Sequence, residues 1–242
     1  MNRILFEKEE ICDGFAVFGG VRAEHVRTVL HGEIGQPLKT GVVDGPIGTS
    51  VITAMDGDSI TVKVDHNAQA LPPWADLVLA PPRPRVMKRL LPQLATLGVG
   101  RIFLVGAKKV EKDFWGATLL KPENYRPLLV DGLMQGGTTA LPVIETRRNF
   151  RKFVTEELDS FFPSKRRIVA HPYAGDATAA PGDGRDGGRL LLAIGPEGGW
   201  TDDEVALLES KGFVRHSLGR RILRTDTATI GLLVKLNDEE GR

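Results

Sequence analysis

The spacing of apolar residues along the chain changes at Pro72-Pro73. Before that point, short apolar runs alternate with Gly, Asp and Asn turns, which predicts strands over residues 15–18, 37–43, 50–54 and 59–64. The last run alternates apolar and polar residues after the turn Asp56-Gly57-Asp58. A short helix is predicted over residues 23–30. Several short strands at this spacing favour a small β-barrel over residues 1–72.

After Pro72-Pro73 the pattern alternates between buried strands and amphipathic helices. Strands are predicted over residues 76–80, 101–105, 167–171, 190–194 and 214–218, and helices over 84–97 and 123–134. Pro92 lies inside the first of these helices and is expected to kink or interrupt it. Residues 175–188 are rich in Gly, Ala, Asp and Pro, which predicts a mobile surface loop. The alternation favours an α/β fold with a mainly parallel sheet over residues 73–242.

Two strands in the last quarter of the chain each end in a glycine-bearing loop that leads into a helix. Residues 190–194 are followed by Gly195-Pro-Glu-Gly-Gly-Trp200, and then by a capping box formed by Thr201 and Glu204. Residues 214–218 are followed by a second loop that starts at Gly219, and Thr225 is predicted to be the N-cap of the last helix. Adjacent strand ends of this kind form the ligand-binding crevice of α/β sheets. Neither loop has the spacing of a Walker loop or of a dinucleotide fingerprint.

The composition favours a folded protein without a membrane span, a signal peptide or disulfides. The chain has 242 residues, of which 41% are hydrophobic and 26% are charged, as expected of a folded protein. No apolar run approaches the ~18 residues of a membrane span, and the N-terminus lacks the apolar region of a signal peptide. The single cysteine, Cys12, excludes internal disulfides and cysteine-rich zinc sites, and fits a cytoplasmic protein. The five histidines show no ligand spacing, so no metal is expected.

The formal net charge of +1 conceals a strong local bias. Residues 1–70 carry six Lys and Arg against ten Asp and Glu, whereas residues 83–112 carry eight basic residues against one acid, Glu111. Four of these basic residues, the basic segment, are expected to bind RNA phosphates: Arg83, Arg85, Lys88 and Arg89. Charge alone is equally compatible with a solvated basic face that has no partner.

The two glycine-bearing loops carry a specific resemblance. Ile194-Gly-Pro-Glu-Gly-Gly-Trp200 with Asp203-Glu204-Val205, and the run from Leu218 to Ala228, resemble the signature of the ribosomal RNA small subunit methyltransferase E family. This family belongs to the SPOUT superfamily of knotted methyltransferases. Weaker similarity covers most of the remaining chain, at His25, Asp44-Gly45, Leu97-Gly98-Val99, Gln135 and Pro142. The resemblance implies a PUA-like, RNA-binding β-barrel over residues 1–72 and a SPOUT-type knotted methyltransferase domain over residues 73–242.

The resemblance also implies an activity. Members of the family are homodimers that transfer a methyl group from S-adenosyl-L-methionine to N3 of a uridine in 16S rRNA, with the cofactor held in the knot near the dimer interface. Carried over residue by residue, the cofactor site comprises His171, Ile194, Gly195, Pro196, Gly198, Gly199, Leu218, Gly219, Ile222 and Leu223. Backbone groups of Leu218, Gly219, Ile222 and Leu223 would hold the adenine. The apolar last helix, with Ile230, Leu232, Leu233 and Leu236, exceeds what one core face requires and favours a dimer.

Two residues beside the loops are candidates for catalysis. A sulfonium methyl group is already activated, so the enzyme mainly needs to position the reactants. Uracil N3 must lose a proton, and Arg224 is expected to stabilise the negative charge that results. Glu197 could order its loop or accept a proton. An ion pair at a helix end or dimer interface is the alternative role for Arg224.

The sequence departs from the family pattern outside the two loops. Gln93 and Thr96 replace a lysine and a glutamate, and Met134 and Thr138 replace a glutamate and an arginine. We expect these positions to line the RNA-facing or interdomain side. They leave open a divergent paralogue that acts on another RNA site, a non-catalytic RNA-binding module, or a methyltransferase for tRNA or protein.

Overall fold

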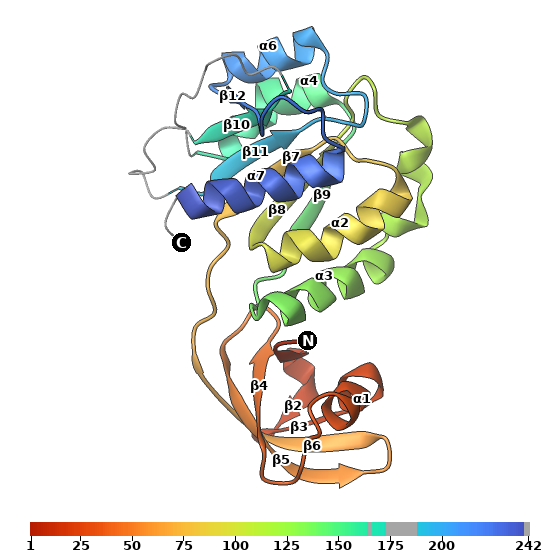
Figure 1. The fold of residues 1–242 in the computed structure, drawn as a ribbon, viewed down its shortest axis with the longest axis vertical. Helices are drawn as coiled ribbons and strands as arrows, with labels where there is room; N and C mark the ends of the chain where they lie inside the picture. Colours follow the sequence, from red (N-terminus) through yellow and green to blue (C-terminus); the bar gives the residue numbers. More distant parts are fainter. Residues whose placement is uncertain (164–165, 173–187, 240–242) are drawn as a thin grey trace.

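The computed structural model describes residues 1–163, 166–172 and 188–239, which form two six-stranded sheets at opposite ends of an elongated molecule (Figure 1). The N-terminal sheet has the order β1 (Ile4–Phe6), β4 (Pro37–Val42), β5 (Ile47–Asp56), β6 (Ser59–Ala68), β3 (Phe15–Phe18) and β2 (Ile11–Cys12). Its strands pair antiparallel except β1 and β4, which are parallel. Because β1 and β2 are edge strands, the sheet is an open half-barrel and not the closed barrel that the strand spacing predicted.

The N-terminal sheet has a core of its own. Along β6, Ile60 and Val62 are buried while Lys63 is exposed, as the alternating sequence predicted. Helix α1 (Gly20–Thr28) adds Ala23 and Val26 to the same core. Between β1 and β2 lies the short helix η1 (Lys8–Glu10). The N-terminal half-barrel therefore has a hydrophobic cluster separate from those of the second sheet, except for Leu5 of β1, which packs with the C-terminal cluster.

The C-terminal sheet is parallel throughout, as predicted. Its order is β12 (Val214–His216), β10 (Arg167–Ala170), β11 (Leu190–Ile194), β7 (Ala75–Leu79), β8 (Val99–Val105) and β9 (Val143–Arg147). One face is covered by α2 (Pro84–Thr96), α3 (Pro122–Gly136) and α7 (Thr225–Glu239) (Figure 1). The other is covered by α4 (Phe150–Lys152), η4 (Phe153–Glu157), α5 (Leu158–Phe161) and α6 (Asp202–Ser210). Two short helices, η2 (Lys112–Gly116) and η3 (Thr118–Leu120), link β8 to α3.

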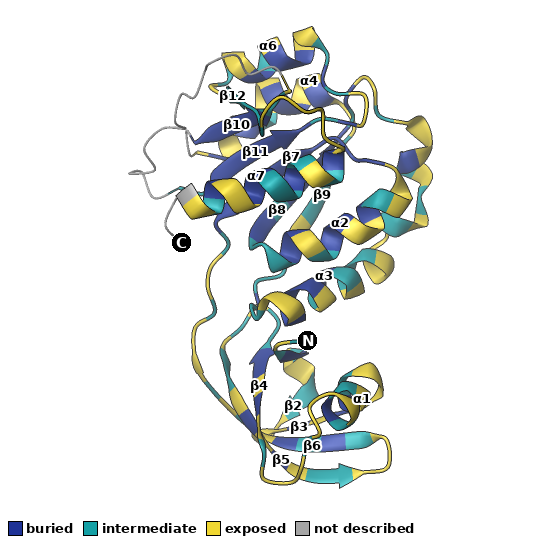
Figure 2. Cartoon of the chain, viewed as in Figure 1, coloured by how far each residue is buried: buried dark blue, intermediate teal, exposed yellow. Residues whose placement is uncertain are grey.

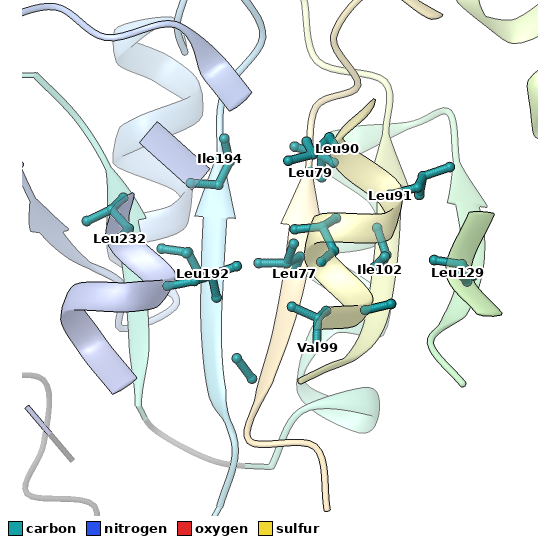
Figure 3. Close-up of a cluster of buried hydrophobic side chains, with 14 of the residues drawn as sticks. Leu77, Leu79, Leu90, Leu91, Val99, Ile102, Leu129, Leu192, Ile194 and Leu232 are labelled. Carbon is teal, nitrogen blue, oxygen red and sulfur yellow. The ribbon is translucent and has the colours of Figure 1, made fainter. Parts of the chain in front are cut away.

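The core of this domain is two-sided because its central strands are buried on both faces. All five residues of β7 are buried. Leu77 packs with Leu192 and Ile102 beneath α2 and α7, as Figure 3 shows, while Val78 faces the opposite helices. Figure 2 shows the same arrangement, with dark central strands and exposed outer faces on α2, α3 and α7. Among the described residues, no helix is long and apolar enough to cross a bilayer.

Of the two effects predicted for Pro92, a kink or an interruption of its helix, the structure contradicts the interruption. Helix α2 continues through Pro92 from Pro84 to Thr96. Proline removes the N–H that would bond to the carbonyl group four residues earlier. That residue, Lys88, lies on the exposed face, where water can supply the missing donor. Gly98, with φ of +77°, follows the end of the helix as predicted.

Two expectations for the last helix are also wrong. Thr225 is not the N-cap, because the carbonyl group of Arg224 accepts the hydrogen bond from the Ala228 N–H. Leu232, Leu233 and Leu236 are buried inside this chain, with exposures of 2%, 0% and 1%. These three leucines fill the domain's own core and contribute nothing to a dimer face, whereas Ile230 is half-buried and Val234 on the same helix is 52% exposed.

The two domains meet at a joint formed by the N-terminus, the β4–β5 turn, Arg126 and the end of α3. The N–H groups of Asn2 and Arg3 both donate to the Met134 carbonyl, at 2.9 and 3.0 Å. Arg126 forms a two-pronged ion pair with Glu7 at 2.6 and 2.8 Å. Asp44 accepts a hydrogen bond from the Leu141 N–H at 2.7 Å. We call this set of contacts the interdomain joint.

The positions that depart from the family pattern lie at or beside this joint. The Thr138 hydroxyl donates to the Leu71 carbonyl, and the Thr96 hydroxyl donates across to the Gly132 carbonyl of α3 at 2.9 Å. Met134 is buried, and only Gln93 of the four is exposed. Met134 and Thr138 therefore lie at the joint, whereas Thr96 lies between α2 and α3 within the C-terminal domain and Gln93 lies on the exposed face of α2. Residues 173–187, which include most of the predicted mobile loop 175–188, lie outside the described part of the chain.

Candidate functional site

A cavity of about 420 Å³ opens at the carboxyl ends of β10, β11 and β12. Three loops form its walls: His171 and Pro172 after β10, residues 194–200 after β11, and residues 217–223 after β12. The first turns of α7 close it with Thr225, Ala228 and Leu232. Because the strands are parallel and adjacent, their carboxyl ends bring these three segments of the chain together.

The loop after β11 is held by hydrogen bonds that leave most of its side chains free. The predicted capping box is present, with the Thr201 N–H donating to the Glu204 carboxylate at 2.9 Å. The other oxygen of that carboxylate accepts the Lys108 N–H at 2.7 Å, which fastens the loop to the segment after β8. Gly199 adopts φ of +70°, a conformation that favours glycine. Glu204 is buried and fully used in these contacts, so it is a structural carboxylate.

Trp200 forms part of the cavity wall and explains why Gly195 must lack a side chain. A Cβ atom at Gly195 would lie 3.1 Å from the Trp200 backbone nitrogen and 3.1 Å from its ring. The indole packs against Phe150, with ring centroids 5.2 Å apart. Its buried Nε1 has no hydrogen-bond partner among the described residues. An unsatisfied donor buried at a cavity wall fits a site that is completed by a polar ligand.

The loop after β12 presents backbone and apolar side chains to the cavity. Gly219 adopts φ of +105°, and the Ser217 hydroxyl bonds to both its N–H and its carbonyl group. Ile222 is 76% exposed, and Leu223 is 37% exposed. The Thr225 hydroxyl donates to the Gly195 carbonyl at 3.4 Å, which ties the two glycine-bearing loops together.

Nearly all of the predicted cofactor residues line this cavity. They are His171, Ile194, Gly195, Pro196, Gly198, Gly199, Leu218, Ile222 and Leu223. Gly219 is on the same loop but does not contribute to the lining. Of the two candidate catalytic residues, Glu197 lines the cavity, whereas Arg224 is exposed and lies outside the lining.

Sequence reasoning did not assign several lining residues, among them Trp200, Asp202, Ser217 and Arg221. Trp200, Asp202 and Arg221 lie within or beside the two motifs, so the motif boundaries were the signal that could have found them. His216 and Ala170 come from the strand ends and are placed only by the pairing of β10 with β12.

The four cations of the basic segment differ in whether they form ion pairs. Arg83 pairs with Glu111 at 3.0 Å and with Glu197 at 3.5 Å, and the bond to Glu111 raises the pKa of Arg83 above its ordinary value. Arg89 lies 3.7 Å from Asp226. Arg85 and Lys88 are exposed on α2 and have no carboxylate partner among the described residues. Two of the four cations are therefore available for phosphates without breaking an ion pair.

The chemistry of the cavity indicates a small organic ligand. Its volume lies in the ~300–1,000 Å³ range of ligand pockets. Apolar walls from Ile194, Leu218 and Leu232 stand beside backbone polar groups of the two loops. In the described residues, no three His, Cys, Asp or Glu side chains group together as a metal site.

Comparisons with known proteins agree with this geometry. A family model described as RNA methyltransferase domain matches residues 69–237. The ribosomal RNA small subunit methyltransferase E of Treponema pallidum is 33% identical over 233 residues, covering 94% of this chain and 87% of that protein. The protein of the same name from Mycobacterium tuberculosis is 26% identical over 238 residues, covering 94% and 88%.

Two solved structures share the fold over nearly their whole length. The ribosomal RNA small subunit methyltransferase E of Neisseria gonorrhoeae, bound to S-adenosyl methionine, has a TM-score of 0.73 at 18% identity, covering 98% of this chain and 97% of that one. A putative methyltransferase from Legionella pneumophila, in complex with its bound cofactor SAM, has a TM-score of 0.72 at 24% identity, with the same coverage.

Proposed function

This chain belongs to the ribosomal RNA small subunit methyltransferase E family, and on that premise we propose that it transfers a methyl group from S-adenosyl-L-methionine to small-subunit ribosomal RNA. The proposed target atom is N3 of a uridine in 16S rRNA. The observation that supports the proposal most directly is the cavity between the two glycine-bearing loops, because the family motifs form its walls. The proposed place of action is the cytoplasm, where this RNA is assembled into ribosomes.

The residues of the cavity fit S-adenosyl-L-methionine. A nucleoside with an amino-acid tail needs an apolar slot for its base and polar groups for its edges and its tail. Leu218, Ile222 and Leu223 would hold the adenine with their backbone groups, and Ile194 and Leu232 would pack against it. The unsatisfied Trp200 N–H lies where a ligand would complete the wall.

The protein's contribution to the reaction is positioning and electrostatics. When bound, the cofactor supplies an electrophilic methyl group on a sulfonium sulfur. The glycine-bearing loops hold that group in place and keep their side chains clear of it. Arg224 would stabilise the negative charge that develops on the base, from its exposed position at the start of α7. Glu197, on the cavity wall, is the candidate to order the loop or to accept the proton.

Three further features belong to the same proposal. The loops after β10, β11 and β12 would form the trefoil knot of the SPOUT superfamily, and the N-terminal half-barrel would act as a PUA-like RNA-binding domain. The active form would be a homodimer. That last expectation now depends on family membership alone, since the leucines of α7 are buried within the chain.

A direct experiment tests the proposed function. The purified chain is incubated with methyl-labelled S-adenosyl-L-methionine and unmodified 16S rRNA, free or in small subunits, and the labelled nucleoside is mapped. Label at N3 of a uridine is the expected result. Calorimetry should show one S-adenosyl-L-methionine site per chain with S-adenosylhomocysteine as competitor. Cofactor binding with label on another RNA would instead identify a paralogue, and cofactor binding without transfer to any RNA would contradict the proposal.

A further inference from the structure

A second cavity, of about 320 Å³, lies beside the cofactor cavity at the same edge of the sheet. It opens above β7 and β8, whereas the first opens above β10, β11 and β12. The two cavities meet at Pro196, Glu197 and Gly198, which line both. The remaining walls of the second cavity are Pro81, Pro82, Arg83, Lys109, Glu111 and Phe114. The mechanism described above makes no use of this space.

The walls of the second cavity combine apolar surfaces with two cations, Arg83 and Lys109, and two carboxylates, Glu111 and Glu197. Pro81 and Pro82 follow β7 and are buried, and Phe114 is 2% exposed. Arg83 enters from the start of α2 and Lys109 from the segment after β8. A cavity with proline and phenylalanine surfaces and with hydrogen-bonding cations and carboxylates at its edge suits a nucleobase, which has a hydrophobic plane and polar groups on its rim.

The two cations differ in how far their charge is already balanced. Arg83 is engaged by two carboxylates, Glu111 and Glu197. The Lys109 ammonium donates to the Gly198 carbonyl at 2.8 Å and has no carboxylate partner among the described residues. Its stem also packs on that glycine, since a Cβ atom at Gly198 would lie 3.0 Å from Lys109 Cδ. A lysine ammonium that takes part in no ion pair among the described residues is thus held against the loop that separates the two cavities.

We propose that the second cavity holds the methyl-accepting base, with Lys109 as a catalytic cation that binds the rim of the base and stabilises its deprotonated form. The inference rests on the proposed function and adds the acceptor subsite to it. A uridine bound there would stand beside the cofactor cavity across the Pro196–Gly198 border, with its carbonyl oxygens toward Lys109.

The chemical step balances without a further reactant. The proton on N3 leaves to a carboxylate or to water, and the electron pair of that N–H bond stays on nitrogen. That pair forms the new N–CH₃ bond as the S–CH₃ bond breaks, and the electrons of the broken bond remain on sulfur. The anionic base therefore becomes a neutral methylated base, and the cationic sulfonium becomes a neutral thioether. A fixed ammonium lowers the cost of the anion before transfer, since it acts where the negative charge develops.

The test compares Lys109→Gln with Lys121→Gln, which removes the same charge from an exposed lysine at the start of α3. Single-turnover methyl transfer is measured at saturating 16S rRNA and cofactor across a range of pH, together with the affinity for each. Lys109→Gln should lower the rate by roughly 10²–10³-fold, as for a lost oxyanion donor. Its pH–rate profile should move to higher pH, because the base must then deprotonate without help. Lys109→Arg should restore most of the rate, and Lys121→Gln should resemble the unaltered enzyme.

The possible results separate this inference from the proposed function. If the unaltered enzyme binds cofactor but methylates no RNA, the proposed function fails and the acceptor site fails with it. If it methylates RNA and Lys109→Gln matches Lys121→Gln in rate and profile, the acceptor site is elsewhere while the function stands. If Lys109→Gln loses rate only in proportion to lost cofactor or RNA affinity, with an unmoved profile, Lys109 holds the loop or grips phosphates, and the inference is overturned.

Discussion

The carboxyl edge of the C-terminal sheet and the interdomain joint differ in whether their polar groups have partners within the chain. At the edge, backbone hydrogen bonds and the buried Glu204 fix the loops, while Trp200 Nε1 and the Lys109 charge are left unbalanced among the described residues. At the joint, the side chains of Arg3, Arg126 and Asp44 form hydrogen bonds with other residues of the chain. Binding capacity thus lies where polar groups lack internal partners, and rigidity lies where they are satisfied.

The two regions also differ in how far their sequences follow the family pattern. The edge carries the two motifs that resemble the family. The joint departs from the pattern at Met134 and Thr138, yet it stays connected, because the Met134 carbonyl accepts from Asn2 and Arg3 and the Thr138 hydroxyl donates to the Leu71 carbonyl. Contacts that serve only packing can be replaced by other contacts, which frees the joint to diverge.

The largest expected effect is at the edge. Arg224→Ala should lower the single-turnover rate by about 10²–10³-fold, or about 2.7–4 kcal/mol, if Arg224 stabilises charge on the base. RNA and cofactor affinities should stay close to those of the unaltered enzyme. Arg220→Ala, on the same exposed loop, is the matched control. Full turnover by Arg224→Ala would remove its catalytic role, and Glu197 or Lys109 would be the next candidate.

The packing of α2 on α3, which carries the joint, should respond in stability and not in chemistry. A Cβ atom at Gly132 would lie within 3 Å of the Pro92 carbonyl oxygen, so Gly132→Ala forces α2 and α3 apart. Overpacking of this kind costs ~1–3 kcal/mol of unfolding free energy, measurable by denaturant titration. Gly116→Ala is the control, because nothing lies within 4 Å of its added Cβ. Equal stability of the two variants would show that the helices adjust freely.

A smaller effect is expected from Gly219→Val. No atom of the described chain lies within 4 Å of an added Cβ, so valine would meet no clash within the protein itself. The backbone at φ of +105° is instead unfavourable for a β-branched residue, at a cost of ~1–3 kcal/mol. Cofactor affinity should fall by roughly tenfold or more in calorimetry. Unchanged affinity would place the adenine away from this loop, and Gly116→Val controls for the added side chain.

The smallest effect concerns the grip on RNA. Arg85→Glu and Lys88→Glu remove cations that have no carboxylate partner in the described chain, and each should flatten the salt dependence of RNA binding by about one unit of slope. Arg83→Glu and Arg89→Glu should change it less, because those cations are already paired. Methyl transfer at saturating RNA should remain nearly normal for Arg85→Glu and Lys88→Glu. Equal slopes for all four variants would contradict the distinction.

Local patterns predicted much of the fold, and long-range pairings account for what they missed. The alternation in β6 and the helix that Thr201 and Glu204 cap were predictable because each depends on neighbours in sequence. The parallel sheet was inferred only from the alternation of strands and helices, which does not give the strand order. Strand β1 has three residues and exists through pairing with β4, so no periodicity could reveal it. Strand β9 is half-exposed at a sheet edge, and its polar residues mask the strand pattern.

The candidate site shows the same division. Its cofactor residues were predictable since they form two contiguous motifs. The pairing of Arg83 with Glu197 joins segments far apart in sequence, so charge counting over residues 83–112 overlooked it. The role of Lys109 depends on its bond to Gly198, which only the adjacency of two loops creates.

The order of the C-terminal sheet has a consequence for how the protein is made. Strand β7 pairs with β11, so the centre of the sheet forms only when Ala75 meets Leu190, which lies far along the chain. Contacts of such long range are formed late in folding. During synthesis, β7 can pair with β8 but must remain without β11 until residues 190–194 have been made. The candidate site, which lies at the carboxyl ends of β10, β11 and β12, is therefore completed only when the end of the chain is available, and until then an apolar strand edge is exposed to aggregation.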